Sequence, residues 1–241
     1  MKILFVAALL TCGFAVFAQV VRTQKTMTGE EYNKMMASIA PKDHRIYDVS
    51  GKVVDSATAK KMAKTFEYEL GLQKRAGEQE YKYVIQKVNL AKKEQEDKAE
   101  LPFHRPKSEK LLEGATLDLS PLVNRTDLSK LEGKAIVLIF WKPQYGGLFA
   151  STYEVIDDFI GTNKFDVFAI TNLPYDAARD FLKKHPINAH HIIDASSIVD
   201  FYGIDDEPVI VVTNAQHQIT FAIKGSLTMI PRVLHKALKE L

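Results

Sequence analysis

The sequence predicts an α/β domain preceded by a smaller α+β region, and three observations carry the prediction. An unbroken apolar run over 135–141 is typical of a strand buried on both faces of a sheet. Strand-like and helix-like segments alternate after it, ending in two neighbouring strands and a helix. Before residue 105, strand-like segments instead alternate apolar and polar residues, as in a half-exposed hairpin. A length of 241 residues accommodates one medium domain and a smaller companion.

The composition excludes several classes of protein. Hydrophobic residues make up 46% and charged residues 26%, which argues against wholesale disorder and against several membrane spans. With 32 Lys and Arg against 30 Asp and Glu, the formal charge is +2, so no nucleic-acid partner is expected. Cys12 is the only cysteine. Disulfide scaffolds, cysteine-based zinc sites and thiol catalysis are therefore excluded for the rest of the chain.

Residues 1–18 are interpreted as a signal peptide. A nearly unbroken apolar run follows Lys2 and ends at the small residue Ala18, where we expect cleavage and export to the periplasm or the exterior. The run is shorter than the about 20 apolar residues of a spanning helix, so no stable membrane span is expected. Lipid attachment at Cys12 is the alternative, although the residues that follow it are apolar rather than the polar tether of a lipoprotein.

Residues 19–105 are expected to form the α+β region. The predicted elements are a helix over 28–40, strands over 46–49 and 52–54, a short helix from a Ser56 cap to about Lys64, and a hairpin over 66–88. The hairpin should bury the alternating apolar residues Phe66, Tyr68, Leu70 and Leu72 on one face. The Lys- and Glu-rich segment 91–100 and the prolines beyond it predict a linker at about 100–110.

Residues 112–241 are expected to form the α/β domain. Strands are predicted over 116–122, 135–141, 165–171, 192–193, 209–213 and 219–223, and helices over 148–160, 176–184, 197–202 and 229–240. Strand, helix, strand, helix, hairpin and terminal helix in that order give a sheet with a parallel half and an antiparallel half.

This order of elements, together with the segment Glu132-Gly-Lys-Ala-Ile-Val-Leu-Ile-Phe-Trp141, resembles the thioredoxin-like proteins of the bacterial envelope, the TlpA type of thiol-disulfide oxidoreductase. The resemblance covers about residues 112–241 and implies a thioredoxin-like three-layer α/β/α domain. In that family the strand ending in Phe-Trp leads to a Trp-Cys-x-x-Cys turn at a helix start, and a cis-proline faces the turn. Here Phe140-Trp141 end the strand, and Glu207-Pro208 stand at the place of the cis-proline.

The catalytic turn departs from the family pattern. The two cysteine positions fall on Tyr145 and Leu148, with Gly146 and Gly147 between them. Thiol-disulfide exchange needs one thiolate to attack and a second thiol to resolve, and peroxide reduction also needs a cysteine thiolate. Enzymatic activity therefore rests on homology alone, and the loss of both thiols argues against it.

The resulting hypothesis is a redox-inactive thioredoxin-like protein of the envelope that binds or scaffolds an extended peptide or an envelope protein. The resemblance implies a binding surface made by Trp141, Tyr145, Gly146, Gly147, Leu148, Glu207 and Pro208. No cofactor or metal is expected. Two alternatives remain open: an oxidoreductase acting on thiols, disulfides or peroxides, and a structural spacer whose function lies in residues 19–105.

Two smaller sites also carry alternatives. The glycines 146–147 at a helix start could expose N–H groups to an anion, or could be a degenerated turn retained for the fold. His185, His190 and His191 could suggest a metal cluster, but adjacent strand residues point to opposite faces, which favours solvated loop histidines.

Overall fold

The computed structural model describes residues 34, 38–74, 77–143, 146–205, 208–225 and 229–241. The chain divides into two compact units between Lys93 and Glu94. The signal-peptide prediction and most of the predicted helix 28–40 lie outside the described residues, although residues 34, 38 and 39 are helical.

The first unit contains a four-stranded sheet. Its elements are β1 (Ile46–Asp48), β2 (Val53–Val54), α3 (Ser56–Lys64), β3 (Tyr68–Gln73) and β4 (Lys82–Lys87). The strand order is β2-β1-β4-β3, in which β1 and β4 are parallel and the other pairs are antiparallel. The predicted strand-turn-strand and hairpin are therefore both present.

The start and the end of α3 differ from the prediction. Asp55, not Ser56, caps the helix, because its carboxylate accepts a hydrogen bond from the backbone N–H of Thr58 at 2.9 Å. Phe66 adopts the left-handed conformation (φ 57°), and its N–H donates to the carbonyl of Ala63. Phe66 thus terminates the helix rather than opening the hairpin, and β3 begins two residues later.

The predicted buried face of the hairpin is wrong at Leu70. Leu70 pairs with Ile85 across the antiparallel register, so the two side chains share a face. Ile85 is 2% exposed, whereas Leu70 is 45% exposed. The reason is position in the sheet: β4 is flanked by strands on both sides, and β3 lies at the edge. Alternation in the sequence identifies the face of a residue but not its distance from the sheet edge.

The second unit contains a five-stranded sheet in the order β7-β6-β5-β8-β9. Its strands are β5 (Ala135–Phe140), β6 (Phe165–Ile170), β7 (His190–Ile192), β8 (Val209–Thr213) and β9 (Ile219–Lys224). Its helices are α5 (Gly146–Ile160), α6 (Tyr175–Lys184), α7 (Ser196–Phe201) and α8 (Ile230–Lys239). The strands β5, β6 and β7 are parallel, and β8 and β9 are antiparallel to their neighbours.

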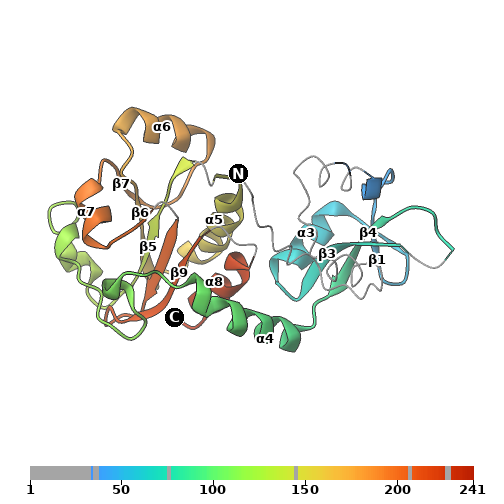
Figure 1. Cartoon of the computed structure of the whole chain (residues 1–241), viewed down its shortest axis with the longest axis horizontal. Helices are drawn as coiled ribbons and strands as arrows, with labels where there is room; N and C mark the ends of the chain where they lie inside the picture. The colour runs from blue at the N-terminus through green and yellow to red at the C-terminus, as the bar shows by residue number, and fades with distance from the viewer. Residues whose placement is uncertain (1–33, 35–37, 75–76, 144–145, 206–207, 226–228) are drawn as a thin grey trace. The chain divides into compact units, whose positions relative to one another are not determined.

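Helices cover both faces of this sheet (Figure 1). The alternate residues Ile136, Leu138 and Phe140 of β5 share one core with α7 and with the irregular segment before β5. Tyr202, at the end of α7, packs edge-on against Phe140 and donates its hydroxyl to the carbonyl of Asp118 at 2.6 Å. Helices α5 and α8 contact each other on the opposite side of the sheet. This is the three-layer α/β/α, thioredoxin-like arrangement that the sequence predicts.

One predicted strand is absent from the second unit. Over 116–122 the structure has a single antiparallel bridge, Thr116 to Gln218, followed by the 3-10 helix η3 (Ser120–Leu122). The carboxylate of Asp118 accepts from the N–H of Ser120, and Pro121 offers no N–H to a neighbouring strand. The apolar residues of this segment still serve the core, since Leu117 and Leu122 are buried.

The segment predicted as a linker contains the 3-10 helices η1 (Leu101–His104) and η2 (Glu109–Leu111). Helix α4 (Leu90–Glu100) precedes it, and its C-terminal part belongs to the second unit. There Asp97 is buried and pairs with Arg232 of α8 through both carboxylate oxygens. One turn away, Glu94 pairs with Lys236 at 3.0 Å, and these two side chains are exposed.

Candidate functional site

The antiparallel register of β5 and β8 brings two of the predicted site residues to one edge of the sheet. Phe140 pairs with Val209 at the end of this ladder. Trp141 follows the first and Pro208 precedes the second, so the two stand opposite each other where the ladder ends. Both are buried. The carbonyl of Pro208 is already occupied by the N–H of Gly225, 2.8 Å away.

The other predicted site residues are described only in part. Helix α5 begins at Gly146, and Gly147 and Leu148 lie in its first turn, but their surroundings are outside the described part of the structure. Tyr145 and Glu207 lie outside the described residues. The expected cis bond involves Glu207 and therefore also lies outside them.

Trp141 is held by two described contacts. Its backbone N–H donates to the carbonyl of Ile170 at 3.0 Å, and its indole stacks on Phe181 of α6 with ring centroids 5.0 Å apart. The side chain is 2% exposed, yet its indole N–H meets no acceptor among the described residues. A buried donor without an acceptor costs about 1–3 kcal/mol, and native proteins pair the great majority of such groups. The indole N–H of Trp141 is therefore an exception among the buried donors of this edge.

A small hollow adjoins Trp141 at the carboxyl ends of the parallel strands β5 and β6. Its volume is about 10 Å³, which is room for about one water molecule. Besides Trp141, its polar lining consists of Lys142, Thr171, Asn172 and Asp205. In open α/β sheets, ligands commonly bind outside the carboxyl ends of the strands, which is where this hollow lies.

The sequence reasoning missed Lys142, Thr171, Asn172 and Asp205, and also Phe181. A usable signal existed for two of them: Thr171 and Asn172 directly follow β6, as Trp141 follows β5. The carboxyl ends of neighbouring parallel strands meet at one edge, so polar residues just after such strands are expected to converge. No comparable signal marks Phe181, which reaches Trp141 only through the packing of α6.

The three histidines have separate neighbours. His185 lies beside the ring of Phe181, and His190 lies beside that of Phe168. His191 Nε2 is 3.0 Å from the carbonyl oxygen of Ile187, which it can bond only as a donor. Among the described residues, no group of three or more His, Cys, Asp or Glu side chains is placed to hold a metal ion.

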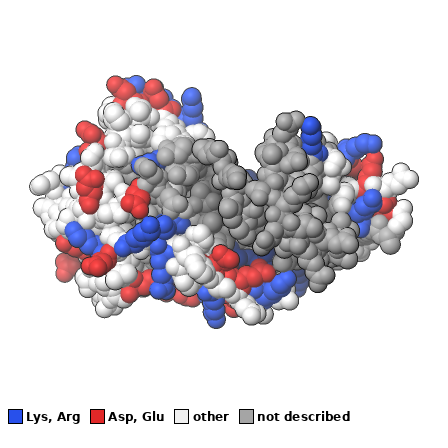
Figure 2. All heavy atoms as spheres, in the orientation of Figure 1, with Lys and Arg blue, Asp and Glu red and all other residues white. Residues whose placement is uncertain are grey.

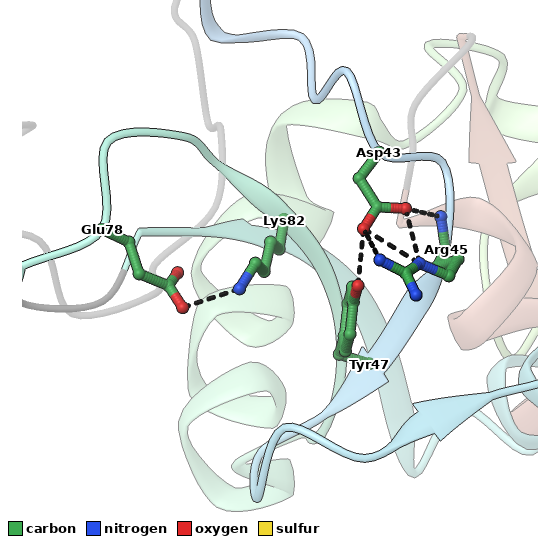
Figure 3. Close-up of polar contacts among 5 residues, drawn as sticks. All are labelled: Asp43, Arg45, Tyr47, Glu78 and Lys82. Carbon is green, nitrogen blue, oxygen red and sulfur yellow. Dashed lines mark hydrogen bonds and ion pairs between the residues drawn. The ribbon is translucent and has the colours of Figure 1, made fainter.

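The first unit has a polar cluster of its own (Figure 3). The carboxylate of Asp43 accepts from the guanidinium of Arg45 at 2.7 Å and from the hydroxyl of Tyr47 at 2.5 Å. The hydrogen bonds from Arg45, and next that from Tyr47, hold the pKa of Asp43 well below its usual range. Beyond Tyr47, Lys82 pairs with Glu78 at 2.7 Å.

This cluster borders a hollow of about 50 Å³, which Gln73 and Gly51 also line. The ammonium of Lys82 lies 5.3 Å from the ring centroid of Tyr47, close enough for a cation–π interaction. The cations Arg45 and Lys82 are each matched by a carboxylate. The hollow thus has no net charge that would select an ionic ligand.

Charges of both signs are mixed on the visible surface. Figure 2 shows acidic and basic side chains side by side on the described parts of that face. Within the described ranges, no helix is both long enough and apolar enough to cross a membrane.

Comparison with known proteins gives matches by structure alone. No protein-family model matches the chain, and no curated protein does. A secreted disulfide oxidoreductase of Mycobacterium tuberculosis, homologous to E. coli DsbE, is 23% identical over 48% of this chain and 88% of its own, with a TM-score of 0.42.

Two further structures match in the same way. A PrxQ mutant from Xylella fastidiosa is 14% identical over 54% of this chain and 96% of its own, with a TM-score of 0.44. A thioredoxin-like protein from Parabacteroides distasonis is 17% identical over 53% of this chain and 96% of its own, with a TM-score of 0.40. Because these scores lie below 0.5, the fold assignment rests on the strand order and directions described above.

Proposed function

We propose that this protein is a redox-inactive, TlpA-like member of the thioredoxin-like superfamily that binds an extended peptide or protein segment at the edge formed by Trp141 and Pro208. A single observation carries the proposal: the thioredoxin-like unit has no cysteine at all, since the only one in the chain is Cys12. The fold keeps the strand end and the helix start that hold the reactive thiols in active relatives, and lacks the thiols.

The chemistry of this edge suits binding. Without a thiolate there is no nucleophile for exchange with a disulfide. Half-buried Phe181, which stacks on Trp141, offers apolar area, and half-buried Asn172 offers hydrogen-bonding groups at the hollow. Apolar surface with a few polar groups that fix orientation is the usual composition of a small binding site.

Reduced, carbamidomethylated α-lactalbumin is a suitable binding probe, because its alkylated cysteines keep it unfolded and prevent any exchange. We expect saturable binding to the protein starting at Gln19. We also expect no reduction of insulin disulfides above the rate of a protein-free blank. Turnover of insulin would establish the oxidoreductase alternative and overturn the proposal.

A pair of variants locates the surface. Asn172 lines the hollow, and Gln216 lies exposed in the turn after β8, at the opposite end of that strand from Pro208. Asn172→Arg should weaken binding of the unfolded probe at least several-fold, whereas Gln216→Arg should leave it unchanged. Equal binding by both variants would favour the alternative in which residues 19–105 carry the function.

The proposal includes a place in the bacterial envelope. The basis is the amino-terminal segment, in which Lys2 precedes an apolar run that ends at Ala18. Expressed with its own amino terminus in a Gram-negative host, the protein should be recovered from the periplasm with an intact mass that begins at Gln19. A lipid-modified mass beginning at Cys12 would show anchoring instead.

A further inference from the structure

The edge strand β3 lacks the features that usually protect a sheet edge. Native proteins cover their sheet edges, keep them short, or interrupt them with Lys, Pro or a bulge. Strands β2 and β7 are only two and three residues long. Strand β9 contacts η1 and is covered at Ile219, whose N–H and C=O bond to Ala115 and Gly114. Strand β3 is six residues long, contains neither Lys nor Pro, and pairs with β4 without a bulge. It is therefore the least protected sheet edge in the described part of the chain.

The backbone groups of β3 that face outward belong to alternate residues. The N–H of Val88 donates to the carbonyl of Glu67 at 2.8 Å, which makes these two a hydrogen-bonded pair in line with the β3–β4 ladder. Hydrogen-bonded and non-hydrogen-bonded pairs alternate along an antiparallel ladder. The N–H and C=O groups of Tyr68, Leu70 and Leu72 therefore point away from β4. Among the described residues, none outside the strand bonds to these groups.

This row of outward groups is self-complementary. When two copies of β3 pair antiparallel about a twofold axis through Leu70, each Leu70 lies opposite the other. Tyr68 of each copy then lies opposite Leu72 of the other. Every outward N–H meets an outward C=O, because all three pairs are hydrogen-bonded pairs. An axis through Glu69 or Gly71 would pair only two of the three outward residues within the strand.

The side chains of β3 fit the same register. On one face the two copies of Leu70, each 45% exposed, would cover each other, with half-buried Tyr68 and Leu72 beside them. On the other face Glu69 of each copy lies opposite Gly71 of the other. Like charges are therefore not directly opposed, which would be destabilising in a cross-strand pair.

We propose that β3 pairs with β3 of a second copy of this chain, which joins two four-stranded sheets into one. The interface consists of one strand from each copy and is small, so the dimer is reversible rather than permanent. The proposal goes beyond the proposed function, because it uses the first unit and needs neither Trp141 nor Pro208.

Sedimentation velocity of protein starting at Gln19 tests the dimer over about a hundredfold range of concentration. We expect the mass to rise from monomer towards dimer. Leu70→Lys sets two ammonium groups opposite each other at the axis and should weaken dimerisation by about tenfold or more. Leu112→Lys is the matched control, since Leu112 is 51% exposed and lies in the second unit. A chain that stays monomeric throughout, or a folded Leu70→Lys variant that dimerises as well as the control, would overturn the proposal.

A single cysteine tests the register. In protein starting at Gln19, Leu70→Cys supplies the only thiol, and α-carbons of a hydrogen-bonded pair lie about 5.5 Å apart, within disulfide range. Mild oxidation should link this variant into dimers faster than Leu112→Cys, which reports chance collisions. Glu67→Cys, exposed on the same edge but placed opposite Gln73, should link no faster than Leu112→Cys. Equal rates for all three variants would overturn the proposed register.

An extended peptide is the other strand that such an edge accepts. If the chain stays monomeric and Leu70→Lys binds the unfolded α-lactalbumin probe more weakly than Leu112→Lys does, the edge receives a peptide and self-pairing is wrong. If the chain dimerises through Leu70 and both variants bind the probe equally, self-pairing is supported. Loss of probe binding by every form of the protein would instead contradict the proposed function and leave the dimer in place.

Discussion

Phe140 of β5 pairs with Val209 of β8 at the end of an antiparallel ladder, and this pairing sets Trp141 opposite Pro208. The two residues are 67 positions apart in the sequence numbering. The unit that contains this edge has no cysteine, because Cys12 is the only one in the chain.

Restoring the thiols tests the fold at the helix start. In protein beginning at Gln19, Tyr145→Cys with Leu148→Cys places two thiols around the start of α5, where the helix end stabilises a thiolate. We expect the pair to close into a disulfide under mild oxidation, as counted by loss of free thiols. Thiols that stay free in the folded double variant would argue against the thioredoxin-like geometry of the turn, since bridging needs α-carbons within about 7 Å.

The cross-strand partners Ile85 and Leu70 of the hairpin test how position in the sheet affects stability. Ile85→Ala should lower the free energy of unfolding of the first unit by about 2–4 kcal/mol, because a buried side chain is lost from a central strand. Leu70→Ala, at the edge strand, should cost less than about 1 kcal/mol. Urea unfolding followed by circular dichroism measures both. Equal losses would mean that the edge position does not protect Leu70 from packing.

The two ion pairs between α4 and α8 should contribute differently to the free energy of unfolding of the second unit. Asp97→Asn leaves Arg232 without its charge partner in a largely buried place and should destabilise the second unit by about 1–3 kcal/mol. Glu94→Gln removes an exposed pair and should cost less than about 0.5 kcal/mol. Fluorescence of Trp141 during urea unfolding reports on the second unit alone. A larger loss for Glu94→Gln would contradict the assigned burial.

Acid should weaken the second unit through His235 of α8. Burial, and next the charge of Lys239, lower the pKa of His235, while Asp158 opposes the shift. The unfolded chain therefore binds the proton more tightly, so stability present at pH 7 is lost as the pH falls below the unfolded value of about 6.5. His235→Gln should reduce the loss of unfolding free energy between pH 7 and pH 5. Lys239→Gln should reduce this loss partly. If the unfolding free energy of both variants depends on pH as that of the unsubstituted protein does, the assignment to His235 is contradicted.

The sequence by itself determined the order of the elements from β5 onward and the class of the second unit. The run 135–141 places apolar side chains on both faces of the strand, which is typical of a central strand. The alternation of strand-like and helix-like segments after it indicates an α/β domain. The absence of a thiol from this unit is likewise a property of the sequence alone. These features are local, since each depends on residues adjacent in the chain.

Only the tertiary structure decided which residues meet. The exposure of Leu70 depends on β3 being an edge strand. The hollow beside Trp141 combines the ends of β5 and β6 with residues after α7. Such contacts join positions far apart in the chain through packing and register, which the periodicity of a single segment does not encode.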